Sequence, residues 1–391
     1  MSTNPVPLPC LQSGSPGWLL PRLLFGVVVA YAALLGTTFF NGHWLIGADG
    51  QARATDFIAF WAAGKLVLQG NASLAYDWHV HKSAATAASG ATFSGFFSWQ
   101  YPPTLLLLTP MFALVPYATA LLGWMVLTGA AFAITIKSIV QSRLALLAAV
   151  AWPAVFWNVV VGQTGFLTAA LLGGGTLFLP RHPLLAGILF GLLTYKPQFG
   201  LLIPIALVAG GCWRAVGSAM ATAILLAAVT TGAFGIEIWS AFWAGIRSIN
   251  STLLLEGGAG FAEMQSFYAF LRAAGSGKEV AITAHVVLVA VLATGLVTIW
   301  RSRCSFDIKA AALTVSTVLA SPYAFIYDLV ALVVPLAFLA RTGFSRREYL
   351  VIAVAGILVG WGPSHVLPTG LISGLLVLAL TVARLKQQIR G

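Results

Sequence analysis

Charged residues are scarce in this sequence. They make up 8% of its 391 residues, whereas 59% are hydrophobic, and a typical soluble domain carries roughly 25% charged residues. A soluble globular domain is therefore excluded. Apolar runs of roughly 18 or more residues recur from Leu20 almost to the end, and each can cross a hydrocarbon core about 30 Å thick. Because these runs are continuous rather than alternating, a β-barrel is excluded, and the sequence predicts an all-α polytopic membrane protein.

Cysteine is also scarce, and no motif indicates a metal site. The three cysteines, Cys10, Cys212 and Cys304, are expected inside or at the inner surface, so we expect no disulfide. There is no C-x-x-C and no His/Cys cluster with metal-ligand spacing. There is also no Gly-rich phosphate loop for a nucleotide. We expect no metal and no cofactor.

Acidic residues number only ten against 21 Lys and Arg, which gives a net charge of +11. In a membrane protein such an excess reports the cytoplasmic loops rather than a nucleic-acid partner. Residues 1–20 lack a positive n-region and a cleavage site after a short apolar core, so they predict a disordered cytoplasmic tail and not a signal peptide. With the N-terminus inside, the inner connections and the C-terminal tail hold most of the Lys and Arg residues: Lys137, Arg143, Arg181, Arg214, Arg301, Arg303, Lys309, Arg341, Arg346, Arg347, Arg384, Lys386 and Arg390.

About twelve spans are predicted, within a range of eleven to thirteen. They lie at about 22–42, 118–138, 144–160, 164–180, 183–195, 198–210, 215–234, 280–300, 308–320, 325–340, 348–361 and 369–384. This assigns one transmembrane domain to 21–385, with a second cytoplasmic tail at 386–391. We expect it in the inner or plasma membrane, with both termini in the cytoplasm.

The segment "YPPTLLLLTPMFALVP", 101–116, is apolar enough to enter the membrane but is interrupted by prolines. Proline lacks the N–H that a helix needs and clashes with the preceding turn. We predict a re-entrant or broken helix that lines a cavity. A full extra crossing is the alternative.

Two long loops, at about 43–100 and 235–279, are predicted on the outer side, and they hold seven of the ten acids. The first begins with "ATDFIAFWAAGKLVLQGNASLAYD", 54–77, which predicts an amphipathic helix lying in the membrane interface. Its large apolar residues would dip into lipid: Phe57, Phe60, Trp61 and Leu68. Asp56 would lie near that apolar boundary, where a carboxylate tends to hold its proton and suits a general base. The alternative is that Asp56, with Thr55, caps the helix.

Two charged residues are predicted at the outer boundary of the membrane. Asp328, in "SPYAFIYD", 321–328, lies inside a span, where an acid is costly and functional by default; the alternative is a structural ion pair or a hydrogen bond to Tyr323 or Tyr327. Lys196, in "TYKPQ", 194–198, suits a lipid phosphate; the alternative is a lysine that snorkels to the headgroups. Gln198 opens the next span.

Weaker signals lie nearby. In "NVVVGQTG", 158–165, Asn158 and Gln163 could hydrogen-bond a sugar or cap helix ends. Gly187 and Gly191 form a G-x-x-x-G pair typical of close helix packing, and "MQSFYAFLR", 264–272, predicts a short loop helix. The polar candidates share the outer side: Asp56, Tyr101, Gln163, Lys196, Gln265 and Asp328. They describe a site for a polar group attached to a lipid.

These segments resemble glycosyltransferase family 87. The resemblance is carried by "DFIAFWAAGKLVLQGNASLAYD", "YPPTLLLLTPMFALVP", "GQTGFLTAALLGGG", "GILFGLLTYKPQ" and "SPYAFIYDL", in that order, from about residue 22 to 385. It implies a GT-C fold and transfer of a sugar, usually mannose, from a polyprenyl phosphate to a glycolipid or glycan acceptor at the outer face. Membrane lipids are the other expected partners.

The resemblance also implies roles for individual residues. Asp56 would be the catalytic base and Lys196 would contact the donor phosphate. Several members have a histidine in the turn where this chain has Tyr323, Tyr327 and Asp328, so the role of that turn stays open. Met264-Gln265-Ser266 stands where N-Q-S is common, which puts an acceptor contact in doubt. No D-x-D occurs, as some metal-dependent GT-C enzymes have.

Two other functions are weighed against a transferase. A polyprenyl-linked glycan ligase would favour several arginines in a large outer loop, and 235–279 has two, Arg247 and Arg272. A transporter or flippase of lipid-linked sugars would favour internal repeats and polar residues at mid-depth, and neither is evident. The transferase is therefore the preferred interpretation.

Overall fold

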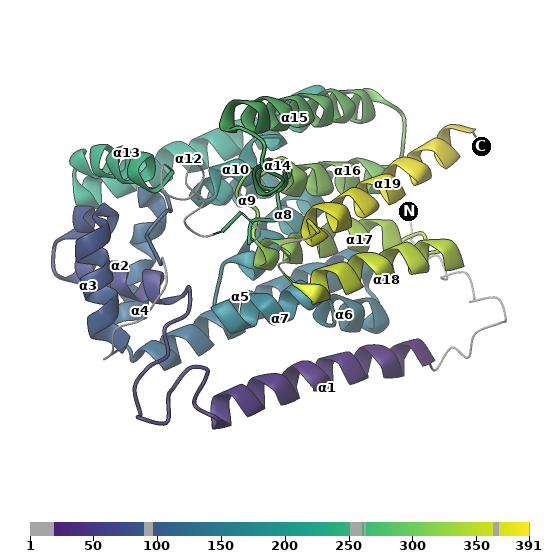
Figure 1. Cartoon of the computed structure of the whole chain (residues 1–391). Coiled ribbons are helices and arrows are strands. Elements are labelled where there is room, and N and C mark those ends of the chain that lie inside the picture. The colour runs from purple at the N-terminus through teal and green to yellow at the C-terminus, as the bar shows by residue number, and fades with distance from the viewer. Residues whose placement is uncertain (1–18, 90–96, 251–259, 262, 363–366, 391) are drawn as a thin grey trace.

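The computed structural model describes residues 19–89, 97–250, 260–261, 263–362 and 367–390. The elements of this part of the chain are helices, which run mainly lengthwise (Figure 1). α1 begins and α19 ends at the same end of the molecule, while α2, α3 and α13 lie at the opposite end (Figure 1). The predicted N-terminal tail lies almost wholly outside the described residues.

Among the described residues, five helices are long and apolar enough to cross a membrane. They are α1 (Leu19–Phe40), α5 (Tyr117–Val140), α12 (Trp213–Phe234), α15 (Lys278–Arg301) and α19 (Thr369–Arg390). A sixth crossing is available to α6 (Arg143–Val150) and α7 (Pro153–Val161), which are bent by 53° where Pro153 interrupts the helix. The prediction of a helical membrane protein is confirmed.

The count of twelve spans and the GT-C fold stay predictions, because the remaining helices at the predicted spans are shorter. These are α8 (Gly165–Phe178), α9 (Pro183–Leu192) with η3 (Leu193–Tyr195), α10 (Pro197–Gly200), α11 (Ile203–Ala209), α16 (Phe306–Leu319), η5 (Ile326–Leu332), α17 (Val333–Ala340) and α18 (Arg346–Trp361). Each predicted span nevertheless coincides with a helix or with a broken pair of helices.

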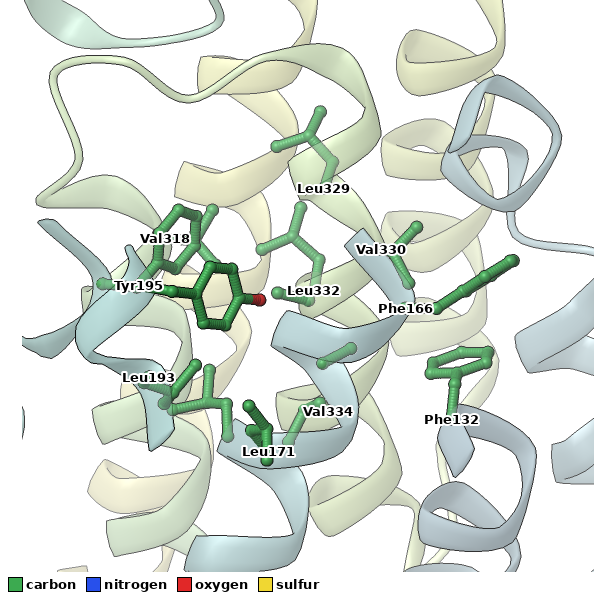
Figure 2. Close-up of a cluster of buried hydrophobic side chains, with 14 of the residues drawn as sticks. Phe132, Phe166, Leu171, Leu193, Tyr195, Val318, Leu329, Val330, Leu332 and Val334 are labelled. Atoms are coloured by element: carbon green, nitrogen blue, oxygen red, sulfur yellow. The ribbon is translucent and has the colours of Figure 1, made fainter. Parts of the chain in front are cut away.

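The core is formed by segments that are far apart in the sequence. Figure 2 shows Phe166 of α8 beside Val330 of η5, and Leu171 of α8 beside Val334 of α17. Phe132 of α5 stacks on Phe166 of α8, with ring centroids 5.4 Å apart. η5, α17 and most of α16 are buried, which explains why most of their residues are apolar.

Close packing at the G-x-x-x-G pair is confirmed. A Cβ atom built on Gly187 would lie 2.4 Å from the carbonyl oxygen of Ala215, and one on Gly191 would lie 2.8 Å from that of Ala219. Only glycine lets α9 and α12 approach this closely. Because both contacts advance by four residues, α9 and α12 run side by side in the same direction.

The segment 101–116 forms two short helices, η2 (Pro103–Leu107) and α4 (Thr109–Ala113). Each has five residues, which is too short to cross a membrane, so the broken helix is confirmed. α4 packs against α2 (Ile58–Leu68), where Gly64 leaves room for the carbonyl oxygen of Thr109.

The outer loops are helical, but one prediction about them is wrong. They contain α2, η1 (Ala72–Tyr76), α3 (Trp78–Ser89), α13 (Glu237–Asn250) and the predicted loop helix α14 (Phe267–Ala273). Phe57 and Phe60 were expected to enter lipid, yet they are 0% and 1% exposed. They pack on Phe112 of α4, because the broken segment offers an aromatic surface that periodicity alone does not reveal. Leu68 is exposed, as expected.

Candidate active site

A cavity of about 940 Å³ opens between these helices. Its walls come from the start of α2, from residues 97–104, from the turn between η3 and α10, from α12 and α13, and from the turn that leads into η5. Eight of the ten candidates from the sequence line it: Asp56, Tyr101, Gln163, Lys196, Gln198, Tyr323, Tyr327 and Asp328. Segments from across the chain therefore meet at one site.

The carboxylate of Asp56 faces this cavity. Asp56 precedes α2, and its neighbour Phe57 donates its backbone N–H to the carbonyl of Val161, 3.1 Å away, which fixes the start of the helix against α7. Oδ2 of Asp56 accepts a hydrogen bond from Nε2 of Gln163 at 3.2 Å. Within the described part of the chain, no side chain caps α2, so the helix-cap alternative for Asp56 is not supported.

Asp77 provides the contrast. Its Oδ1 accepts the backbone N–H groups of His79 and Val80, at 2.9 and 3.1 Å, at the start of α3. Asp77 is thus a helix cap of the ordinary kind. The two acids of segment 54–77 thus have different surroundings: Asp77 caps a helix, whereas the carboxylate of Asp56 lines the cavity.

Gln163 is held so that its amide N–H points to Asp56. Its Oε1 accepts the hydroxyl of Tyr101 at 2.7 Å and the backbone N–H of Thr164 at 3.2 Å. These two donors identify the oxygen end of the amide and leave Nε2 for the carboxylate. Tyr101, Gln163 and Asp56 therefore form a continuous chain of hydrogen bonds along the cavity wall.

The surroundings of Asp56 raise its proton affinity. Burial raises the pKa of Asp56 from its ordinary 3.8 to about 6, the hydrogen bond from Gln163 and the charge of Lys196 lower it, and the charges of Glu263 and Asp328 raise it. A carboxyl with a pKa near 6 is largely ionised at neutral pH yet accepts a proton more readily than an exposed aspartate. Asp56 is thus suited to a general base.

Lys196 lies in the same cavity and is paired with Asp328. Its Nζ lies 2.6 Å from Oδ1 of Asp328, and the two residues are 4% and 1% exposed. Oδ2 of Asp328 accepts the backbone N–H of Phe325 at 3.1 Å. The ammonium also lies 5.3 Å from the ring centre of Tyr327 and 5.6 Å from that of Phe199.

This geometry decides between the alternatives for the two residues. A lysine that snorkels to the headgroups is exposed at its tip, and Lys196 is buried, so snorkelling is wrong. The ion-pair alternative for Asp328 is confirmed. Since Asp328 uses one of the three donor positions of the ammonium, Lys196 keeps donors for an anion in the cavity.

Two predicted site residues are not among those that line the cavity. Asn158 is fully buried, and its Oδ1 accepts the backbone N–H of Gly165 at the start of α8. Gln265 accepts the N–H of Gly370 and the hydroxyl of Thr369 at the start of α19. The helix-capping alternative for Asn158 is therefore supported, and Gln265 joins the second outer loop to α19.

Sequence reasoning missed the other side of the cavity. Glu263 and the aromatic residues Trp157, Trp239, Phe242 and Trp243 also line it. The available signal was the amphipathic pattern of 237–250, whose buried face includes Ile238 and Phe242. That pattern predicts a helix with one buried face, but it does not predict that this helix lines the same cavity as Lys196.

Fold and cavity define a helical membrane protein in which the carboxylate of Asp56 and the buried ammonium of Lys196 line one pocket. Among known families, the model of glycosyltransferase family 87 matches residues 99–322. This is more than half of the chain, and the chain belongs to glycosyltransferase family 87. No curated protein matches the sequence, and no solved structure matches it. Tyr101, Gln163 and Lys196 fall in the matched segment, whereas Asp56 and Asp328 fall outside it.

Proposed function

We propose that this membrane glycosyltransferase transfers a sugar, most simply mannose, from a polyprenyl phosphate to a hydroxyl acceptor. The observation that carries the proposal is the pairing, in one cavity, of a base and a cation. Asp56 is oriented by Gln163, and Lys196 is oriented by Asp328. Acid–base groups and a fixed cation are what the displacement of a phosphate from a sugar requires.

The proposed reaction is a single displacement. The acceptor hydroxyl attacks the anomeric carbon of the sugar while Asp56 takes its proton. The bond between that carbon and the phosphate oxygen breaks, and the electron pair leaves with the polyprenyl phosphate. Because attack comes from the side opposite the leaving group, the configuration at the anomeric carbon inverts. General base catalysis of this kind contributes roughly 10²–10⁴ in rate.

Lys196 would stabilise the departing phosphate. The leaving group gains negative charge as the bond breaks, so a cation held in place stabilises the transition state more than the ground state. Asp328 fixes the ammonium through an ion pair that is itself anchored to the Phe325 N–H. The site would thus select a phosphate by position as well as by charge.

The location of the cavity fits a lipid-linked donor. α2 and α13, which contribute to the cavity lining, lie at the end of the molecule opposite the start of α1 and the end of α19 (Figure 1). Under the predicted topology this is the periplasmic or extracellular side of the inner or plasma membrane. A polyprenyl phosphate sugar can be presented there without a nucleotide, and the residues invoked need no metal or cofactor. The acceptor would be a glycolipid or glycan.

The test is a transfer assay with the purified protein in nanodiscs. Radiolabelled polyprenyl phosphate mannose is supplied with an extract of host lipids and glycans, and wild type is compared with Asp56→Asn. We expect label to move into a new product with wild type, and the rate to fall by roughly 10²–10⁴ in the variant at unchanged melting temperature. Asp77→Asn is the matched control and should keep its rate, because it removes a charge from the same segment while its amide oxygen can still cap α3. Full activity of Asp56→Asn would exclude it as the base.

A further inference from the structure

The lining of the cavity is chemically uneven. The charged residues that line it lie outside α12 and α13: Asp56, Lys196, Glu263 and Asp328. The residues that α12 and α13 contribute are Ala223, Ala227, Trp239, Phe242, Trp243 and Ile246. This apolar part of the lining offers hydrocarbon and aromatic surface rather than charge. A ligand that fills the cavity must therefore have a polar part and an apolar part.

The two alanines lie on the part of α12 beyond its close contact with α9. Gly187 lies against Ala215 and Gly191 against Ala219, and α9 ends at Leu192. Lys196 follows η3, the turn that continues α9. The next turns of α12 carry Ala223 and Ala227, four residues apart and hence on one face.

α12 forms a thin wall between this cavity and the surroundings. Ile224 and Leu225, on its other side, are 65% and 63% exposed. Ala228 is exposed as well and shares that outer face, since it lies four residues after Ile224. The same helix thus lines the cavity with small side chains and faces the bilayer with large ones.

The chemistry of the donor selects the occupant of this side. In a polyprenyl phosphate the first carbon of the chain is bonded to a phosphate oxygen, so the chain begins wherever the phosphate is held. With the phosphate at Lys196, Ala223 and Ala227 offer the chain apolar surface in the same cavity. Lipid tails are as apolar as a protein interior, so an apolar wall distinguishes between lipid chains by the space it leaves for them. Alanine has a smaller side chain than the other aliphatic residues and so leaves more space for a chain.

We propose that Ala223 and Ala227 of α12 bind the first isoprene units of the donor chain and set the room for it. The proposal rests on the proposed function, because it takes its starting point from a phosphate at Lys196. It assigns the α12 side of the cavity to the donor and leaves the remaining space for the acceptor. Trp239, Phe242 and Trp243 would then cover the chain from α13.

The test compares Ala227→Phe with Ala228→Phe. The first substitution fills the cavity side of α12, and the second places the same ring on its outer face. Transfer is measured in nanodiscs as a function of donor and of acceptor concentration. In Ala227→Phe we expect the KM for the polyprenyl phosphate sugar to rise about tenfold or more, as overpacking implies, with the acceptor KM unchanged. Ala228→Phe should match wild type in both.

Binding is measured separately by the quenching of intrinsic fluorescence, since Trp157, Trp239 and Trp243 line the cavity. A long-chain polyprenyl phosphate should bind wild type and Ala228→Phe alike and Ala227→Phe about tenfold more weakly. Methyl phosphate, which has the same head and no chain, should bind all three alike.

Three outcomes would overturn the inference. Ala227→Phe could raise the KM of the acceptor alone, which would assign this wall to a glycolipid acceptor. It could leave both KM values unchanged, or it could weaken methyl phosphate as much as the long chain. Failure of the proposed function looks different, because wild type would then transfer no label while the binding of polyprenyl phosphate would still depend on Ala227.

Discussion

Nζ of Lys196 and Oδ1 of Asp328 lie 2.6 Å apart in the interior of the protein, and they come from segments 132 residues apart in the chain. The pair joins the turn between η3 and α10 to the start of η5. It is the strongest constraint on the position of the cation, because each partner would otherwise be a buried, uncompensated charge.

Removing one partner of this pair should destabilise the fold. We expect Asp328→Asn to lower the free energy of unfolding by about 3–5 kcal/mol, since it leaves the Lys196 ammonium buried without its counter-ion. The measurement is the melting temperature in detergent. The double variant Lys196→Met with Asp328→Leu should recover most of the lost stability but should not transfer sugar. A single variant as stable as wild type would contradict the structural role of the pair.

The rate should depend on pH through Asp56. Burial raises the pKa of Asp56 to about 6, and a base works only when it is deprotonated. The rate should therefore be constant near neutral pH and fall about tenfold per pH unit below pH 6. The measurement is kcat/KM for the acceptor between pH 5 and 8. A profile that stays flat to pH 5 would show that the group in action has an ordinary carboxyl pKa or that Asp56 is not the base.

Gln163 should control that pH dependence. Its hydrogen bond favours the ionised form of Asp56 and lowers its pKa, so Gln163→Leu should move the acid limb to higher pH. Gln198→Leu serves as the control, because Gln198 lines the same cavity and should leave the limb in place. An equal shift in both variants would indicate a general change of the cavity instead of a lost hydrogen bond.

The close spacing of α9 and α12 should depend on the absence of a Cβ atom at Gly187. Gly187→Ala places a Cβ atom 2.4 Å from the carbonyl oxygen of Ala215, so the helices must separate, at a cost of roughly 1–3 kcal/mol. We expect a lower melting temperature and slower transfer, because α9 leads to Lys196. Gly217→Ala is the control, since space is open around Gly217. Equal stability of both variants would refute the close packing.

The sequence predicted much of this fold because its local signals agree with the tertiary structure. Proline geometry predicts the break in 101–116, small residues predict the close contact at Gly187, and apolar runs predict the positions of the apolar helices. Asp56 was found because an acid beside aromatic residues is rare in so apolar a chain. Those signals are properties of one segment and can be read without the fold.

Contacts between segments could not be predicted in the same way. Nothing near Asp56 specifies Gln163, 107 residues away, and nothing near Lys196 specifies Asp328. Phe57 and Phe60 were assigned to lipid because an apolar face fits a bilayer and a protein core equally well. Asn158 and Gln265 resemble ligands in the sequence, but the helix starts that use their amide oxygens become visible only when the chain is folded.

The shortness of α9 has a consequence for the membrane itself. α9 and η3 contain 10 and 3 residues, which span roughly 21 Å, whereas a hydrocarbon core is about 30 Å thick. In the proposed topology Lys196 therefore lies deeper than the headgroups of the outer leaflet. Either the bilayer thins around the protein, or the donor phosphate moves below the level of the headgroups to reach the lysine. The rate of transfer should then depend on the thickness of the bilayer that surrounds the protein.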